Sequence, residues 1–253
     1  MPASCTWLFG RGASIANGLS WTVPDQWKRD LLAGRMSRDE HVRRITDALR
    51  AEVDKLSVPR RSYRRLLNMM ESDTLEHGYH RLFTTNWDHL LQRELLAWIN
   101  ENNGGYAPKF LATHGTVYHL NGWVEQGKWQ NRSPFMLETD DAQTRVRSHE
   151  ANVAFNMILW SPLIVIVGMS FECDTDRGLL GALRKYEDDM PIGGAHFVIV
   201  DPDERSLCAT YAKLAYCFPH GCGTKVKMGL AEWIDAGTPE LVGRIFRAQR
   251  GAS

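Results

Sequence analysis

The sequence lacks an excess of charge of either sign. Its 253 residues include 30 Lys and Arg against 30 Asp and Glu, so the formal net charge is +0 at pH 7. A protein that binds a polyanion through its overall charge carries an excess of basic residues. The arginines of PRRSYRRLL (59–67) could contact phosphate, but the balanced composition favours a solvated helix face. Nucleic acid is therefore not an expected partner.

The sequence also lacks paired cysteine motifs. Its five cysteines are odd in number and form no CxxC pair; they are Cys5, Cys173, Cys208, Cys217 and Cys222. This usage is typical of a reducing compartment and argues against a disulfide framework. Cys217, His220 and Cys222 offer only three ligands, whereas a structural zinc site uses four, so we expect no metal.

Long hydrophobic runs are missing as well. The longest lies in PLIVIVGM (162–169), far short of the about 20 residues that span a bilayer. The first ten residues, MPASCTWLFG, have neither the basic start nor the apolar core of a signal peptide. We therefore expect a cytoplasmic protein with no membrane partner.

What the sequence does contain is a series of apolar runs that alternate with segments of helical period. This alternation predicts an α/β fold with a Rossmann-like, doubly wound parallel sheet, formed as a single domain over residues 1–253. The predicted strands are 6–10, 81–85, 109–113, 117–120, 163–168, 196–201 and 224–228.

A helical insertion is predicted at 24–80, after the first strand, turn and helix. Ser37 and Glu40 form the pattern of a capping box at the start of a helix. The apolar face of that helix consists of Val42, Ile45, Leu49, Val53 and Leu56. A second helix is predicted at 62–75, and we expect the insertion to pack beside the ligand crevice.

The segment TWLFGRGASIANGLS (6–20) changes from an apolar run into a glycine-rich turn and then a helix. Gly10 and Gly12 would let the backbone approach a diphosphate, and free N–H groups at the start of the helix would bind it without a lysine. A dehydrogenase would have glycine in place of Ile15 and an acidic residue about 20 residues on. The segment thus predicts a nucleotide ligand without hydride transfer, and a tight turn with no ligand is the alternative.

Polar residues follow the next strong strand, in HRLFTTNWDHLLQREL (80–95). The carboxyl ends of parallel strands face the ligand crevice of open α/β sheets, so Asn86 and Asp88 are predicted to face the ligand. The alternative for one of the two is helix capping, because Asn and Asp are preferred N-cap residues.

Five segments occur in the order expected of a known family: GRGASIANGLSWTVP (10–24), TTNWD (84–88), VYHLNGWV (117–124), LIVIVGMSFECDTD (163–176) and FVIVDP (197–202). Together they resemble the nucleotide-binding core of sirtuin-like proteins, and most closely the zinc-free bacterial members, which include NAD-cleaving effectors of antiphage defence. The resemblance covers residues 6 to about 228, and the insertion matches only in position. The zinc-ribbon lobe that helps form the acyl-lysine cleft of the deacylases is missing, so a protein substrate is not expected.

The resemblance implies a set of NAD-binding residues. They are Gly10, Gly12, Ala13 and Ser14 at the diphosphate and neighbouring ribose, Thr85 beside them, Gly168 and Ser170 at the adenosine half, and Asp201 near its ribose or adenine. The catalytic candidates are Asn86, Asp88, His119 and Asn121.

The catalytic histidine of sirtuins, in a His-Gly-Ser/Thr segment, has two candidate registers here. His114, Gly115 and Thr116 match the motif literally. The register that we favour aligns VYHLNGW with the family's strand and puts Asn121 at the histidine position, with His119 two residues earlier. Residues two apart in a strand share a face at roughly 6–7 Å, so His119 and Asn121 are predicted to line one pocket. A hydrogen-bonded wall residue is the alternative role for His119.

The activity that the resemblance implies is cleavage of NAD to nicotinamide and ADP-ribose. In this reading Asp88 stabilises developing positive charge, Asn86 holds a ribose hydroxyl or the attacking water, and His119 accepts a proton. The alternative is a non-catalytic module that binds NAD or ADP-ribose and acts through a partner protein. Self-association into a homo-oligomer is left open.

Overall fold

The computed structural model describes residues 4–56, 61–77, 79–111, 115–124, 137, 157–158, 161–172, 176–181, 184, 195–219, 221–237 and 242–243. Its strands are β1 (Ser4–Phe9), β2 (Tyr79–Thr84), β3 (Tyr118–His119), β4 (Leu163–Val167), β5 (His196–Val200) and β6 (Cys222–Val226). They form one six-stranded sheet in the order β3-β2-β1-β4-β5-β6, and every pair is parallel. The predicted Rossmann-like α/β fold is confirmed.

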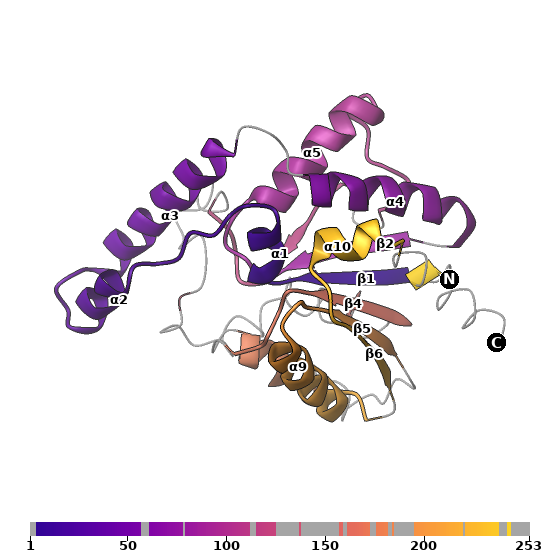
Figure 1. Ribbon diagram of the computed structural model, residues 1–253. Helices are drawn as coiled ribbons and strands as arrows, with labels where there is room; N and C mark the ends of the chain where they lie inside the picture. The colour runs from indigo at the N-terminus through magenta and orange to yellow at the C-terminus, as the bar shows by residue number, and fades with distance from the viewer. Residues whose placement is uncertain are drawn as a thin grey trace.

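Helices cover both faces of the sheet (Figure 1). The labelled helices are α1 (Arg11–Ala16), α2 (Asp25–Leu32), α3 (Arg38–Lys55), α4 (Arg61–His77), α5 (Leu90–Asn102), α9 (Glu204–Cys217) and α10 (Leu230–Asp235). Helices α4, α5 and α10 lie over one face, and α9 lies over the other. Within the described ranges, no helix is long and apolar enough to cross a membrane.

Alternation along the central strand supplies the two halves of the core. Cys5, Trp7 and Phe9 of β1 belong to the cluster under α4 and α5, whereas Leu8 belongs to the cluster on the α9 side. Successive side chains of a strand point to opposite faces, and a parallel sheet is buried on both. This is why β4 reads as a continuous apolar run and β1 ends in one, Trp7 to Phe9.

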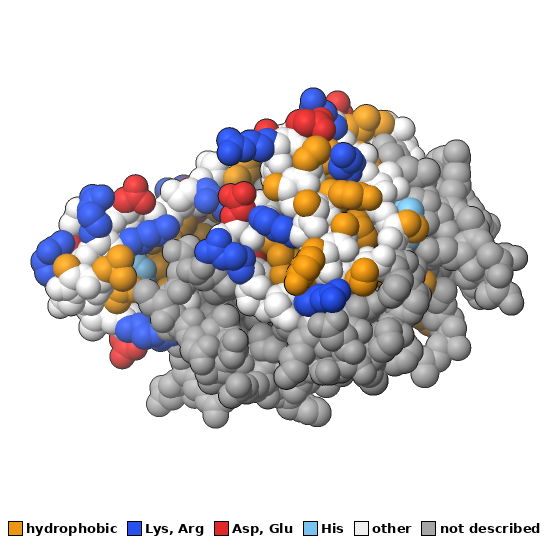
Figure 2. All heavy atoms as spheres, turned by 90° about the horizontal axis from the view of Figure 1, so that it is seen from below, with side chains coloured by type: hydrophobic (Ala, Val, Ile, Leu, Met, Phe, Trp, Pro, Cys, Tyr) orange, Lys and Arg blue, Asp and Glu red, His pale blue; other side chains and the backbone are white. Residues whose placement is uncertain are grey.

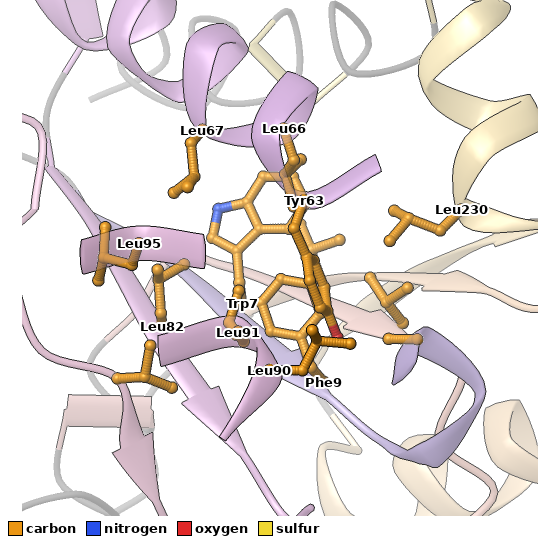
Figure 3. Close-up of a cluster of buried hydrophobic side chains, with 14 of the residues drawn as sticks. Trp7, Phe9, Tyr63, Leu66, Leu67, Leu82, Leu90, Leu91, Leu95 and Leu230 are labelled. Atoms are coloured by element: carbon orange, nitrogen blue, oxygen red, sulfur yellow. The ribbon is translucent and has the colours of Figure 1, made fainter. Parts of the chain in front are cut away.

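The larger cluster positions α4 against the end of β1 (Figure 3). The ring of Trp7 lies 6.2 Å from that of Phe9 and 6.0 Å from that of Trp233 on α10. Tyr63 of α4 meets Phe9 edge to face, with 5.7 Å between ring centroids. Because Phe9 is the last residue of β1, this contact brings the first turn of α4 to the carboxyl edge of the sheet.

The segment that was predicted as an insertion contains three helices. Helix α3 begins as expected, with the Ser37 hydroxyl oxygen accepting a hydrogen bond from Glu40 N at 3.1 Å. Helices α2 and α3 form a lobe beside the sheet, whereas α4 contacts α5, α10 and β2 (Figure 1). The segment thus combines a lobe with a helix that covers the central sheet.

The strand predicted at 109–113 is wrong for its first two residues. Lys109 and Phe110 lie in a turn, in which Leu111 N donates to Pro108 O at 3.1 Å. Only a single bridge follows, between Leu111 and His80, and residues 112–113 lie outside the described ranges. The turn that begins at Pro108 includes residues 109 and 110, which the apolar pattern assigned to a strand.

Candidate functional site

A cavity of about 490 Å³ opens at the carboxyl edge of the sheet. Since all strands are parallel, their carboxyl ends share this edge, and the strand order reverses between β1 and β4. The sheet side of the cavity is lined by Arg11, Ser14, Thr85, Asn86, Trp87, Asp88 and Asn121. The side formed by residues 19–49 contributes Leu19, Trp21, Thr22, Val23, Lys28, Leu31, Leu32, His41 and Leu49, and Leu137 and Asp176 complete the described lining.

Asn86 connects the turn after β1 to the turn after β2. Its Nδ2 donates to Gly10 O at 3.0 Å and to Ser14 Oγ at 2.9 Å. Ser14 Oγ in turn donates to Asp88 Oδ2 at 3.0 Å. The two segments that sequence reasoning assigned to one site are therefore in direct contact, through the chain Asn86–Ser14–Asp88.

Local hydrogen bonds fix these side chains. Thr84 Oγ1 donates to Phe9 O at 3.0 Å and accepts from Asn86 N at 3.1 Å, which holds the turn after β2 against β1. Asp88 Oδ1 accepts from Leu90 N at 3.0 Å, at the start of α5. Asp88 therefore binds the first N–H of α5 with one oxygen and Ser14 with the other, and it lines the cavity; its contact with a ligand stays a prediction.

The carboxylate end of this chain is deeply buried. Asp88 is 7% exposed, and burial raises the pKa of its carboxyl group, while the hydrogen bonds from Leu90 N and Ser14 act in the opposite direction. Among the described residues, no basic side chain forms an ion pair with Asp88. Its carboxyl group therefore has no charged partner within the described part of the protein.

Tyr63 is a site neighbour that sequence reasoning missed. It is 1% exposed, and burial, followed by the nearby charge of Asp88, raises the pKa of its hydroxyl. Its backbone N donates to Asn17 Oδ1 at 3.2 Å, which ties α4 to the segment after α1. In the sequence Tyr63 reads only as a position on a helix, and its place beside the site follows from the docking of α4.

Backbone N–H groups of the glycine turn form hydrogen bonds within the protein. Gly10 N donates to Val167 O at 3.0 Å, Gly12 N to Gly168 O at 2.8 Å, and Ala13 N to Gly10 O at 3.1 Å. The prediction that this turn presents free N–H groups is therefore wrong for these three. A Cβ on Gly12 would lie 2.7 Å from Gly168 Cα, so the glycine allows close approach of two turns.

His119 and Asn121, at the end of β3, do not line the cavity together. Asn121 lines the cavity and donates from Nδ2 to Thr85 O at 3.2 Å, whereas His119 does not belong to the described lining. The strand ends at His119 and a turn begins at the next residue, so the alternation that would put both on one face stops. His114 lies outside the described ranges.

The His119 ring lies against the backbone behind Asn86. Its Nδ1 is 3.3 Å from Asn86 O, and the ring stacks on Trp123 with 4.7 Å between centroids. Burial lowers the His119 pKa to about 4, so the imidazole is neutral near pH 7. These contacts match the role of a hydrogen-bonded wall residue.

The residues expected at the adenosine half lie at the ends of β4 and β5, outside the described lining. Gly168 packs on the glycine turn, and Ser170 O accepts from Lys213 Nζ at 2.7 Å. Asp201 Oδ1 accepts from Asp203 N at 2.9 Å, where the chain enters α9. Their contact with a nucleotide stays a prediction.

His41 is a second residue that sequence reasoning missed. It lies on α3, lines the cavity and is 4% exposed, and its Nδ1 has no hydrogen-bond partner among the described residues. Burial lowers the His41 pKa, and so do the charges of Lys28 and Arg44. Position 41 falls on the apolar face of α3, one residue before Val42, which is the only sequence signal that it points inward.

Among the described residues, no group of three or more His, Cys, Asp or Glu side chains is arranged to hold a metal ion. No known protein-family model matches the chain, and no curated protein matches it significantly. A functional assignment therefore depends on the residues of the cavity themselves.

Proposed function

We propose that this protein binds NAD in the cavity at the carboxyl edge of its sheet and cleaves the bond between nicotinamide and ribose. The observation that carries the proposal is the hydrogen-bonded chain Asn86–Ser14–Asp88, which ends on a buried carboxylate at the edge where Rossmann-like sheets bind nucleotides. The cavity volume of about 490 Å³ falls within the range of small-molecule sites. The resemblance of five segments to sirtuin-like proteins supports the same assignment.

The reaction converts NAD and water into nicotinamide, ADP-ribose and a proton. The carbon–nitrogen bond breaks with its electron pair moving to the nicotinamide, which leaves as a neutral molecule while the ribose carbon becomes an oxocarbenium-like centre. Asp88 supplies negative charge to this centre from a site of low polarity, where electrostatic stabilisation is strongest.

Water then adds to the ribose carbon and loses a proton. Both Nδ2 contacts of Asn86 are made within the protein, so its Oδ1 is the side-chain atom left to orient the water or a ribose hydroxyl. The proton passes to Asp88 through the Ser14 hydroxyl. The raised pKa of Asp88 makes its carboxylate a stronger base for this step.

A second candidate is a module that binds NAD or ADP-ribose without cleaving it and signals through a partner protein. The position of His119 favours this candidate, because its ring faces Asn86 O and lies outside the described lining of the cavity. Binding of NAD without release of nicotinamide would support this candidate over the hydrolase.

The test compares two asparagines that each donate to a backbone carbonyl. Asn86→Ala removes a cavity residue, whereas Asn102→Ala removes a donor to Trp98 O at 3.0 Å on α5, outside the described lining. Nicotinamide release from NAD, measured by chromatography, should fall by about 10²-fold or more in Asn86→Ala and stay at the wild-type rate in Asn102→Ala. Equal rates in Asn86→Ala and wild type would remove Asn86 from the reaction.

A further inference from the structure

We infer that Arg11, Lys28 and His41 form a subsite for the phosphate groups of the bound nucleotide. The inference rests on the proposed function, and it assigns the phosphates to one residue of α1 and two residues of the α2–α3 lobe. All three residues line the same cavity as Asn86 and Asp88.

The backbone of the glycine turn leaves the phosphates without their usual donors. The N–H groups of Gly10, Gly12 and Ala13 all donate hydrogen bonds to carbonyl oxygens of the protein. A diphosphate carries two negative charges, and an anion that leaves water needs hydrogen bonds or opposite charges in exchange. Because three N–H groups of this turn are used within the protein, side chains are the further source of donors and positive charge.

Arg11 and Lys28 are the basic side chains of the described lining, and neither has a carboxylate within ion-pair distance among the described residues. Other basic residues of the same segment do have such partners. The pairs are Arg35 with Asp30 at 2.8 Å, Arg44 with Glu40 at 2.6 Å, and Lys55 with Glu52 at 2.6 Å. Within the described residues, the two cations of the lining therefore have no direct ion-pair partner, although Asp176 and Asp88 line the same cavity.

His41 lies on α3, which contacts the helix α2 that carries Lys28, and both residues line the cavity. The imidazole is buried and its Nδ1 lacks a described partner, so this part of the wall has unused polar capacity. Seen from below, the surface of the α2–α3 lobe carries both basic and acidic side chains (Figure 2).

The cavity therefore has two poles. Asp88 lines it at the sheet edge, and α2 and α3 contribute the basic residues Lys28 and His41 on the other side. Arg11 of α1 and Asp176 also belong to the lining. A dinucleotide with a cationic nicotinamide and an anionic diphosphate matches both poles in one orientation. The nicotinamide ribose then lies at Asn86, and the phosphates lie toward the lobe.

The test measures binding to the full chain by calorimetry, with NAD, inorganic pyrophosphate and uncharged adenosine as probes. Lys28→Gln removes the charge and keeps most of the length, and Lys55→Gln makes the same change on α3 at a residue paired with Glu52 outside the described lining. We expect Lys28→Gln to weaken NAD and pyrophosphate binding at least about tenfold and to leave adenosine binding unchanged. Lys55→Gln should match wild type with every probe.

The outcomes separate this inference from the proposed function. If NAD is bound and cleaved but Lys28→Gln has the wild-type affinity for NAD and pyrophosphate, the subsite is refuted and the hydrolase stands. If pyrophosphate binds in a Lys28-dependent way but NAD is neither bound nor cleaved, the subsite stands and the proposed function fails. If wild type binds neither NAD nor pyrophosphate, both are refuted.

Discussion

Acid should weaken the fold through one buried histidine, His80 on β2. The residue is 4% exposed, and its Nδ1 accepts a hydrogen bond from Trp7 Nε1 at 3.0 Å in the centre of the core. Burial lowers its pKa from 6.5 to about 4, with a small opposing effect of a hydrogen bond to the Met70 backbone. The folded protein therefore holds His80 neutral over a pH range in which the unfolded chain would protonate it.

The sign follows from proton counting. Between pH 6.5 and about 4 the unfolded state binds more protons at this residue than the folded state does, so stability falls as the pH drops through this window. The full shift corresponds to about 3 kcal/mol of unfolding free energy, of which about 2 kcal/mol is lost between neutral pH and about pH 4.5. Above pH 6.5 the contribution is fully present.

Urea unfolding of wild type and of His80→Gln is monitored by far-UV circular dichroism, at neutral pH and at about pH 4.5. Glutamine keeps an acceptor for Trp7 and does not titrate. Other groups, including His119, titrate in both proteins, so the difference between their pH dependences isolates His80. If the two proteins lose the same stability on acidification, His80 is not held neutral by burial and the reasoning fails.

Two further variants test the turns that build the site. Gly168→Ala places a Cβ 2.5 Å from Ala13 N at a φ of +58°. It should lower the melting temperature more than the control Gly34→Ala, whose φ is +68° but whose Cβ would have nothing within 4 Å. Equal losses would mean that the close approach of the two turns does not destabilise Gly168→Ala. Ser14→Ala breaks the link to Asp88 and should destabilise the protein by about 1–3 kcal/mol in chemical denaturation while it lowers nicotinamide release. An unchanged release rate in Ser14→Ala would exclude the proton path through its hydroxyl.

The sequence alone was enough to predict the sheet and the edge that carries the site. Apolar runs of strand length recur with helical segments between them. This pattern depends on the local spacing of apolar residues, which can be read directly from the sequence. The polar residues after β1 and β2 were equally visible, because Asn86 and Asp88 interrupt an apolar context. Their contact through Ser14 then follows from the parallel pairing of β1 with β2.

Tertiary structure decided which of these groups are free to meet a ligand. Gly10 N donates to Val167 O at the end of β4 and Gly12 N to Gly168 O in the turn that follows, partners more than 150 residues away that no local pattern identifies. His119 leaves the cavity because β3 ends one residue too early for the alternation to continue. His41 and Lys28 reach the cavity because their lobe docks beside the sheet, and the relative placement of two packed bodies is set by long-range contacts that a single sequence does not encode in its periodicity.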